Sequence, residues 1–243
     1  GTKKSTFNSA KSLSLYGKGK FDVKLVNAVG EWSSTKDINT VNFFNNIYNL
    51  LPKGGFIKSR FSYSIIFLLS IIPLYKLLKK NKPDYLIAHL ITSLPIFLFR
   101  IFNFKTKLIL RISGYPKLNF TRKFLWKFCS KKIHIVTCPS KELREQLNNS
   151  KIFDEKKIIV LYDSVINIQE VNNKKKIPLE KSLSKIKYFL AIGRLTKQKN
   201  FNLLIDGFNE FNKENKKYKL LIIGEGEDRD KLKKKINKLK LNN

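Results

Sequence analysis

Short apolar runs alternate with amphipathic segments along most of the chain, a pattern typical of an α/β protein with parallel sheets. The runs are rich in Ile, Leu and Val, and most precede a stretch with apolar residues at helical spacing. The pattern predicts strands at 21–26, 85–89, 107–112, 133–138, 157–162, 188–192 and 219–223. It predicts helices at 6–16, 61–80, 94–101, 121–130, 141–148, 201–214 and 228–239.

The alternation stops in a polar, lysine-rich stretch that contains Pro178. We therefore place a linker at 169–185, between a first domain of residues 1–168 and a second domain of residues 186–243. Within the first domain, Ser140 directly precedes a predicted helix and is expected to cap it.

The longest apolar run extends from Tyr63 to Leu78 and contains Pro73 and Lys76. It is shorter than the ~20 residues that a membrane-spanning helix needs. We interpret it as a buried or interfacial helix.

The formal net charge of +31 first suggests a nucleic-acid or anionic membrane partner. However, 42 of the 49 basic residues are lysine, and Asn and Ile are also abundant, as drift toward A/T-rich codons would produce. No helix-turn-helix, zinc or single-strand module is visible, so a nucleic-acid partner is not expected. We ascribe the larger part of the charge to drift and the smaller part to a weak interaction with an anionic surface.

Cys129 and Cys138 have no partners at metal-ligand spacing and are expected to be buried, reduced thiols. The chain has no Met and begins at Gly1. We expect it to be a piece of a longer protein, truncated at both ends and without the first strand of its N-terminal domain.

The strongest chemical signal is an apolar strand that leads into Gly193 and Arg194, followed by Lys199 and then by a helix. A planar guanidinium, an ammonium group and the start of a helix all favour a bound phosphate. A second strand ends in Gly224-Glu225-Gly226. The two turns predict a site for a diphosphate, with Glu225 itself expected to face solvent.

Gly193-Arg194-Leu195, a Lys199-Asn200 pair and Gly224-x-Gly226, at these spacings, resemble the start of the nucleotide-sugar domain of family 4 glycosyltransferases (glycosyl transferases group 1). The resemblance implies a GT-B fold with two Rossmann-like domains, the second one incomplete here. It implies that Arg194 and Lys199 bind the diphosphate of a UDP- or GDP-linked sugar and stabilise the leaving nucleotide. It also implies transfer with retention and without a metal or other cofactor. The family's Glu pair would follow Asn243, so we expect the fragment alone to be inactive.

The first domain resembles the same family more weakly. Ser113-Gly114, the predicted acceptor-side loop, stands where relatives often have His-Gly. Asp163-Ser164 replaces the usual Asn-Gly, so contact with the donor is not expected at that turn. His89 is then the histidine nearest the predicted cleft between the domains, and a structural role and a catalytic role are both left open.

Two segments, Pro95 to Phe104 and Phe120 to Phe128, interleave aromatic and basic residues, as lipid-binding surfaces do. Packing in the core is the alternative. By analogy with relatives that extend polyprenyl-diphosphate-linked glycans, we expect a cytoplasmic protein peripheral on the inner leaflet. Its acceptor would be a glycan or a lipid-linked glycan of cell-surface polysaccharide or lipopolysaccharide biosynthesis.

Two other functions stay open at this point. A nucleotide-sugar epimerase shares the GT-B fold and a diphosphate site, although it has no need of basic aromatic surfaces. A basic protein that binds nucleic acid or a membrane surface would account for the charge but not for the glycine turns.

Overall fold

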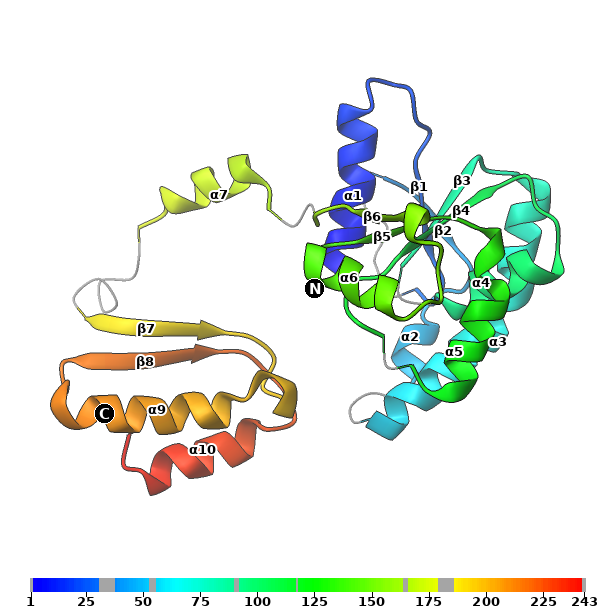
Figure 1. Cartoon of the computed structure of the whole chain (residues 1–243). Coiled ribbons are helices and arrows are strands. Elements are labelled where there is room, and N and C mark those ends of the chain that lie inside the picture. The colour runs from blue at the N-terminus through cyan, green and yellow to red at the C-terminus, as the bar shows by residue number, and fades with distance from the viewer. Residues whose placement is uncertain are drawn as a thin grey trace. The chain divides into compact units, whose positions relative to one another are not determined.

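The computed structural model describes residues 2–30, 38–52, 56–89, 92–116, 118–163, 166–178 and 186–241, with side chains from residue 5 and not at 56–60. The chain divides into two compact units, Gly1–Asn167 (unit 1) and Ile168–Asn243 (unit 2). Each unit is described by itself (Figure 1).

The main sheet of unit 1 has four parallel strands in the order β3-β4-β5-β6. Their bounds are β3 (Tyr85–Ala88), β4 (Lys107–Arg111), β5 (Ile133–Cys138) and β6 (Ile158–Val160). Leu108 and Leu110 of β4 are fully buried, and Ile109 between them is half-buried. A parallel strand with both faces covered has this nearly continuous apolar sequence, which is why the pattern identified all four strands.

A second, smaller sheet in unit 1 pairs β1 (Lys24–Asn27) with β2 (Asn39–Asn42) in parallel. The sequence of β2, Asn-Thr-Val-Asn, contains a single apolar residue. Apolar patterning therefore could not identify this strand.

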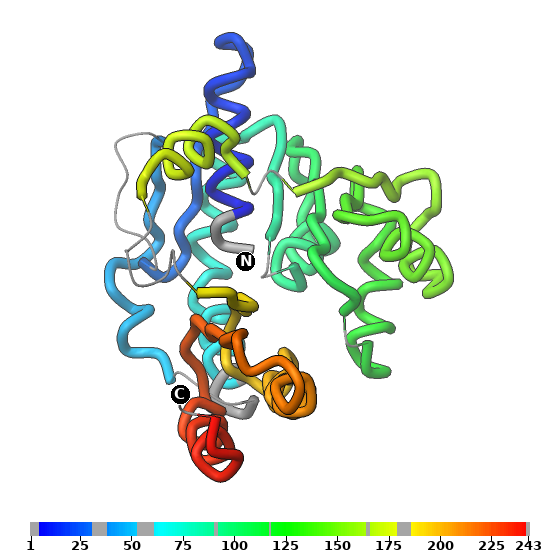
Figure 2. The backbone as a smooth tube through the Cα atoms, turned by 90° about the vertical axis from the view of Figure 1, so that its left-hand side faces the viewer, coloured from blue at the N-terminus to red at the C-terminus, as the bar shows by residue number. Residues whose placement is uncertain are grey.

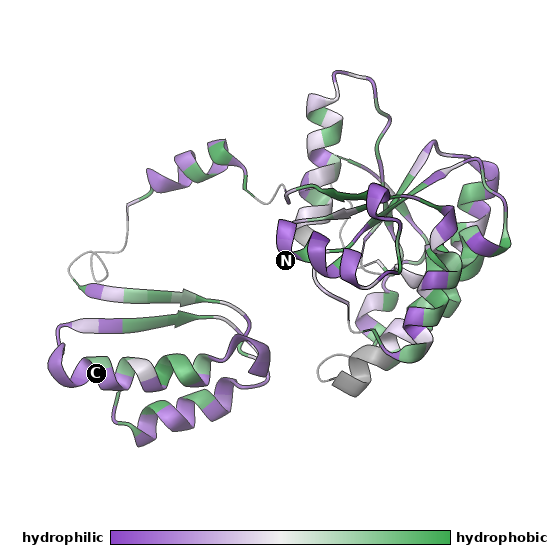
Figure 3. Ribbon diagram, in the orientation of Figure 1, coloured by the Kyte–Doolittle hydropathy of each residue, from purple (hydrophilic) through white to green (hydrophobic). Residues whose placement is uncertain are grey.

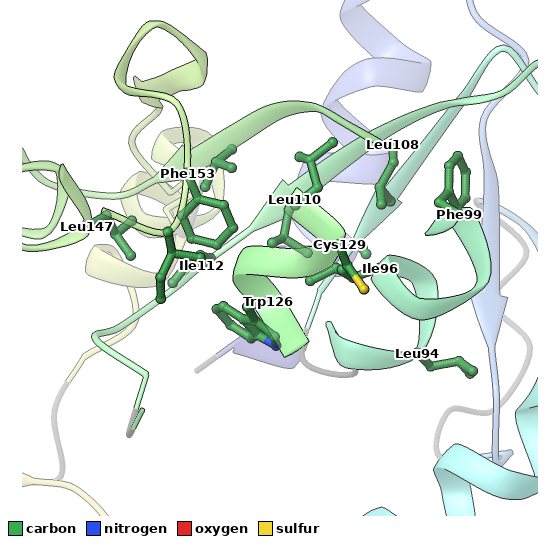
Figure 4. Packing of buried hydrophobic residues seen from close by; sticks show 14 of the residues in the cluster. Leu94, Ile96, Phe99, Leu108, Leu110, Ile112, Trp126, Cys129, Leu147 and Phe153 are labelled. Carbon is green, nitrogen blue, oxygen red and sulfur yellow. The ribbon is translucent and has the colours of Figure 1, made fainter. Parts of the chain in front are cut away.

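Helices cover the main sheet and connect its strands. Unit 1 contains α1 (Thr2–Tyr16), α2 (Ile47–Leu50), α3 (Phe56–Lys80), α4 (Ser93–Ile101), α5 (Phe120–Cys129), α6 (Lys141–Asn149) and the 3-10 turns Ser130–Lys132 and Glu155–Lys157. Side chains from β4, α4 and α5 form the centre of the core (Figure 4). Trp126 and both cysteines are buried there, as predicted for the thiols. Ser140 caps α6 by accepting a hydrogen bond from the Leu143 amide at 3.2 Å, also as predicted.

The helix α3 is longer and more exposed than the sequence suggested. It runs for 25 residues and continues through Pro73, although proline removes one helical hydrogen bond. Its Phe61–Lys80 part is apolar (Figure 3) and is long and apolar enough to cross a membrane by length and composition alone. Of its most apolar window, 22% is buried. The expectation of a run too short to span is therefore wrong. Leu74 and Leu78 of this helix are buried in the core of unit 1, and the interfacial interpretation of its exposed side stays a prediction.

Unit 2 consists of α7 (Ile168–Lys175), β7 (Lys187–Ile192), the 3-10 turn Lys197–Lys199, α9 (Phe201–Glu214), β8 (Tyr218–Ile223) and α10 (Arg229–Lys238). The two strands pair in parallel. Ala191 and Ile222 pack against Ile205 of α9 and Leu232 of α10, and the helices lie side by side (Figures 1 and 2). One face of the strand pair is thereby covered.

The opposite face of this strand pair is apolar and exposed, with Leu190, Ile192 and Ile223 each more than half accessible. The helix α7 lies in the stretch predicted as a linker, and all its residues are exposed. Its polar sequence has too few apolar residues to indicate a helix.

Candidate functional site

The two glycine turns of unit 2 lie next to each other at the carboxyl end of its strands. Ile192 pairs with Ile223 in the β7–β8 register, so Gly193 and Gly224 leave the sheet side by side. The Gly193 amide donates a hydrogen bond to the Ile223 carbonyl at 3.0 Å. Farther along, the Leu195 amide donates to the Glu225 carbonyl at 2.9 Å. The sequence prediction that these turns belong to one structure is confirmed.

Gly224 and Gly226 are needed because the Gly193–Leu195 backbone passes directly over them. A Cβ atom at Gly224 would lie far inside the 3.0 Å limit from the Gly193 carbonyl oxygen. One at Gly226 would lie 2.8 Å from the Leu195 amide nitrogen. Gly193, by contrast, has no positive φ, and its Cβ would meet only side chains, the Phe201 ring at 3.4 Å and the Lys199 Cδ atom at 4.0 Å. The Gly-x-Gly turn therefore supports the loop that carries Arg194.

Arg194 and Lys199 are both exposed on this loop. Among the residues that the structure describes, no carboxylate pairs with either side chain. The nearby Glu225 carboxylate instead accepts two hydrogen bonds from Arg229, at 2.8 and 3.0 Å. The loop thus offers two cations whose charge is not balanced by the acidic residue beside it.

The helix α9 begins directly after this loop. Asn200 holds the left-handed conformation at its start, with φ 50° and ψ 43°, which asparagine tolerates better than most residues. The first amide groups of a helix have no partner within the helix and favour anions. Arg194, Lys199 and this helix start lie on one loop, which we name the anion-binding loop after the sequence prediction. Anion binding at Gly193, Arg194 and Lys199 stays a prediction.

In unit 1, the carboxyl ends of three strands bring together His89, Arg111 and Asp163. Ala88 pairs with Leu110, so His89 and Arg111 are neighbours. The Arg111 guanidinium, only 5% exposed, pairs with Asp163 and donates a hydrogen bond to the Leu161 carbonyl. Ser5 of α1 donates to the same Asp163 carboxylate at 2.9 Å. Burial alone would raise the pKa of Asp163, but these hydrogen bonds outweigh it and lower that pKa.

His89 is held neutral by its surroundings. Burial and then the positive charge of Arg111 lower its pKa to about 4, against a weaker opposite effect of Asp163. Its Nδ1 atom is buried and has no hydrogen-bond partner among the described residues. A neutral imidazole at pH 7 can accept a proton or a hydrogen bond, so the structure leaves the two predicted roles of His89 both open.

Unit 1 is expected to lose stability as the pH falls from 6.5, the ordinary pKa of histidine, toward 4. Over this window the unfolded chain binds a proton at His89 that the folded chain does not, which favours unfolding. At about pH 5 the loss amounts to roughly 2 kcal/mol. Urea unfolding at about pH 7.5 and about pH 5, followed through Trp126 emission in a Trp32→Phe background, measures it, and His89→Gln should remove most of the difference. An undiminished difference in that variant would assign the effect to another group.

The predicted acceptor-side loop, Ser113 and Gly114, lies at the rim of a cavity in unit 1 and is exposed. A Cβ atom at Gly114 would meet nothing within 4 Å, so packing does not require glycine there. Sequence reasoning missed Arg111 and Arg122, which line the same cavity. A signal was present for Arg111, because an arginine inside an apolar parallel strand must be buried with a partner.

Residues 172–243 match the family model described as glycosyl transferases group 1. The chain is 30% identical over 189 residues to an uncharacterised glycosyltransferase of Methanocaldococcus jannaschii, covering 69% of this chain and 46% of that protein. It is 28% identical over 169 residues to the N-acetylgalactosamine-N,N'-diacetylbacillosaminyl-diphospho-undecaprenol 4-alpha-N-acetylgalactosaminyltransferase of Campylobacter jejuni, covering 66% of this chain and 42% of that enzyme. The chain thus spans less than half the length of both relatives.

Solved structures share the fold at low sequence identity. HepE of Anabaena, solved with UDP and glucose, has a TM-score of 0.61 at 12% identity, covering 98% of this chain and 64% of that one. A UDP-N-acetylglucosamine 2-epimerase of Rickettsia bellii has a TM-score of 0.57 at 15% identity, covering 96% and 62%. Residues 172–243 therefore match the glycosyl transferases group 1 family, and the chain has the GT-B fold.

Proposed function

We propose that this chain is part of a glycosyltransferase that moves a sugar from a UDP- or GDP-linked donor to a glycan or lipid-linked acceptor. The observation that carries the proposal is the anion-binding loop of unit 2, with two unpaired cations on a backbone that Gly224 and Gly226 support. This loop lies within the residues that match the family model.

The chemistry assigned to the loop is electrostatic. When the bond between the sugar and the nucleoside diphosphate breaks, negative charge grows on the diphosphate oxygens. Arg194 offers a planar fork to two of these oxygens and Lys199 a compact point charge. Cations at this place perform the task that Mg²⁺ performs at other diphosphates, so the proposed transfer needs no metal. The proposal also includes retention at the anomeric carbon, which the family resemblance implies.

The proposed acceptor is a glycan carried on a polyprenyl diphosphate in cell-surface polysaccharide or lipopolysaccharide biosynthesis. The name of the Campylobacter jejuni relative describes a transferase whose acceptor is linked to diphospho-undecaprenol. Such an acceptor is anchored in the membrane, so an enzyme that uses it needs a surface that reaches the lipid.

The exposed side of α5 is the surface that we propose for this contact. Phe120, Phe124 and Phe128 follow one another at helical spacing and are 86%, 67% and 53% exposed. Arg100 lies 4.3 Å from the Phe128 ring centre and adds a basic group. Aromatic rings beside cations settle at anionic lipid interfaces. This proposal places the protein on the inner leaflet, facing the cytoplasm.

Vesicle flotation tests this surface. The chain is expected to float with vesicles that contain anionic lipid, and replacing Phe120 and Phe124 with serine should reduce the bound fraction severalfold. Phe21→Ser, a change at another exposed phenylalanine, serves as the control. Equal losses in both variants would show that α5 is not the docking surface.

A transfer assay tests the proposed activity and separates it from the alternatives. The protein in its full natural length is incubated with UDP- or GDP-sugars and a prenyl-diphosphate-linked glycan, and products are identified by mass. Transfer predicts an acceptor heavier by one sugar and a released nucleoside diphosphate, whereas an epimerase would leave a nucleotide sugar of unchanged mass. The affinity for UDP or GDP should weaken only slightly as the salt concentration rises. The affinity of a nucleic-acid-binding protein for its ligand would instead fall steeply.

A further inference from the structure

A cavity of about 310 Å³ opens in unit 1 at the carboxyl end of β4, between the start of α4 and the helix α5. The residues that shape it include Thr92, Arg111, Ser113, Arg122 and Trp126. Two of its lining residues are arginines and none is acidic. Its volume is at the lower end of the ~300–1,000 Å³ of small-molecule sites, which suits a polar head group better than a complete nucleotide sugar.

Arg122 supplies a cation that no acidic residue balances. Its guanidinium carbon lies 4.6 Å from the centre of the Trp126 ring, and its Nε atom is buried without a hydrogen-bond partner. In the described ranges no carboxylate pairs with it. A buried donor without a partner is costly, and an anion in the cavity would remove that cost.

Trp126 holds this guanidinium in place. Its ring is 1% exposed, and its Nε1–H group donates a hydrogen bond to the Ser93 hydroxyl at 3.2 Å. The stacked arrangement therefore fixes Arg122 before any ligand arrives, which reduces the entropy lost on binding.

Two further features make the cavity electropositive. Arg111 lines it with a second guanidinium, although the ion pair with Asp163 offsets much of that charge. The helix α4 begins at Ser93 with no capping bond from the Thr92 side chain. Its first amide groups and its dipole then favour an anion in the cavity that Thr92 lines.

We propose that this cavity binds a diphosphate ester, with Arg122 as its principal charged ligand, and that in the complete enzyme it receives the diphosphate of the lipid-linked acceptor. The identity of the acceptor rests on the proposed function, whereas diphosphate binding at Arg122 does not. Every residue named here belongs to unit 1, whereas the anion-binding loop belongs to unit 2.

The test is a calorimetric titration of the chain with inorganic pyrophosphate and, separately, with farnesyl diphosphate. An Arg194→Ala, Lys199→Ala background removes the competing loop of unit 2. Arg122→Gln should weaken binding of both compounds by at least about tenfold, because a charge-assisted hydrogen bond is lost. Lys123→Gln, which removes the same charge from a neighbouring exposed side chain, should leave binding within about twofold.

Trp126 emission locates the bound ligand. In a Trp32→Phe background Trp126 is the remaining tryptophan, so its emission should change on titration and saturate with the calorimetric signal. Arg122→Lys should retain part of the affinity, which would show that charge rather than a lost fold is responsible. Tighter binding of farnesyl diphosphate than of pyrophosphate would identify the natural ligand as a lipid headgroup. Equal binding of the two compounds would identify it as a free diphosphate.

Several results would overturn the proposal. Equal weakening by Lys123→Gln and Arg122→Gln would show diffuse surface charge instead of a site. Binding that is absent in the Arg194→Ala, Lys199→Ala background but present in the unchanged chain would place the diphosphate on unit 2 alone. Such a loss of binding would leave the assignment of the unit 2 loop as the donor site intact. Conversely, a chain that binds pyrophosphate through Arg122 but whose complete enzyme transfers no sugar would refute the proposed function and leave this site intact.

Discussion

Replacing both Arg194 and Lys199 with alanine is expected to lower the affinity for UDP or GDP by about 100-fold or more. A charge-assisted hydrogen bond contributes ~1.5–3 kcal/mol, and two of them at the lower end correspond to that factor. We use the lower end because both side chains are exposed and solvent screens them. Each single substitution should cost about tenfold, with Arg194→Lys intermediate, since an ammonium group cannot form the two-pronged contact.

Isothermal titration of UDP and GDP into the chain measures these affinities. Lys216→Ala, in the exposed turn between α9 and β8, lowers the net charge by the same amount as each single substitution and should leave binding unchanged. If the double variant bound both nucleotides as tightly as the unchanged chain, the loop would not be the donor site. If Lys216→Ala weakened binding as much as Arg194→Ala or Lys199→Ala, the affinity would come from the general positive charge of the chain.

Gly224→Ala is expected to destabilise unit 2 by about 3 kcal/mol. The new methyl group would overlap the Gly193 carbonyl oxygen, which is backbone and cannot rotate away. The strands must separate or the Gly193–Leu195 backbone must move, and either movement displaces Arg194. The variant should therefore also lose nucleotide affinity, although Gly224 itself offers no charge.

Hydrogen exchange of the β7 and β8 amides measures this loss of stability within unit 2. Gly207→Ala is the matched control, because glycine at this position lies within α9 and a Cβ would meet nothing within 4 Å. Alanine in a helix is more favourable than glycine by roughly 1 kcal/mol, so this variant should exchange more slowly than the unchanged chain. Faster exchange in Gly207→Ala, or unchanged exchange in Gly224→Ala, would contradict the packing argument.

Much of the fold could be predicted from apolar patterning, because the strands of a covered parallel sheet are almost wholly hydrophobic. The strand Ile133–Cys138 and the helix Phe201–Glu214 have the predicted bounds. The other predicted strands and helices differ from the observed ones mainly at their ends, where neighbouring residues and capping decide the boundary. The short strand β2 and the exposed helix α7 were missed because neither buries an apolar face.

The candidate site was predictable where one short segment holds all the chemistry. Arg194 and Lys199 lie on a single loop, and the glycines that support it follow the next strand. The cavity of unit 1 was not predictable in this way. Arg111 and Arg122 come from different elements and line one cavity only in the folded unit, where Asp163 holds Arg111 and the Trp126 ring holds Arg122.

The hydrogen bond from Ser5 to Asp163 has a consequence for the order in which unit 1 folds. It joins residues 158 positions apart, so α1 cannot make this contact during synthesis until nearly all of unit 1 has been produced. Closing so long a loop costs more entropy than forming sheet contacts between residues that are close in sequence. We therefore expect the strands to pair first. The contact between Ser5 and Asp163 is then among the last to form in unit 1, and the polar group around His89 is completed only at that step.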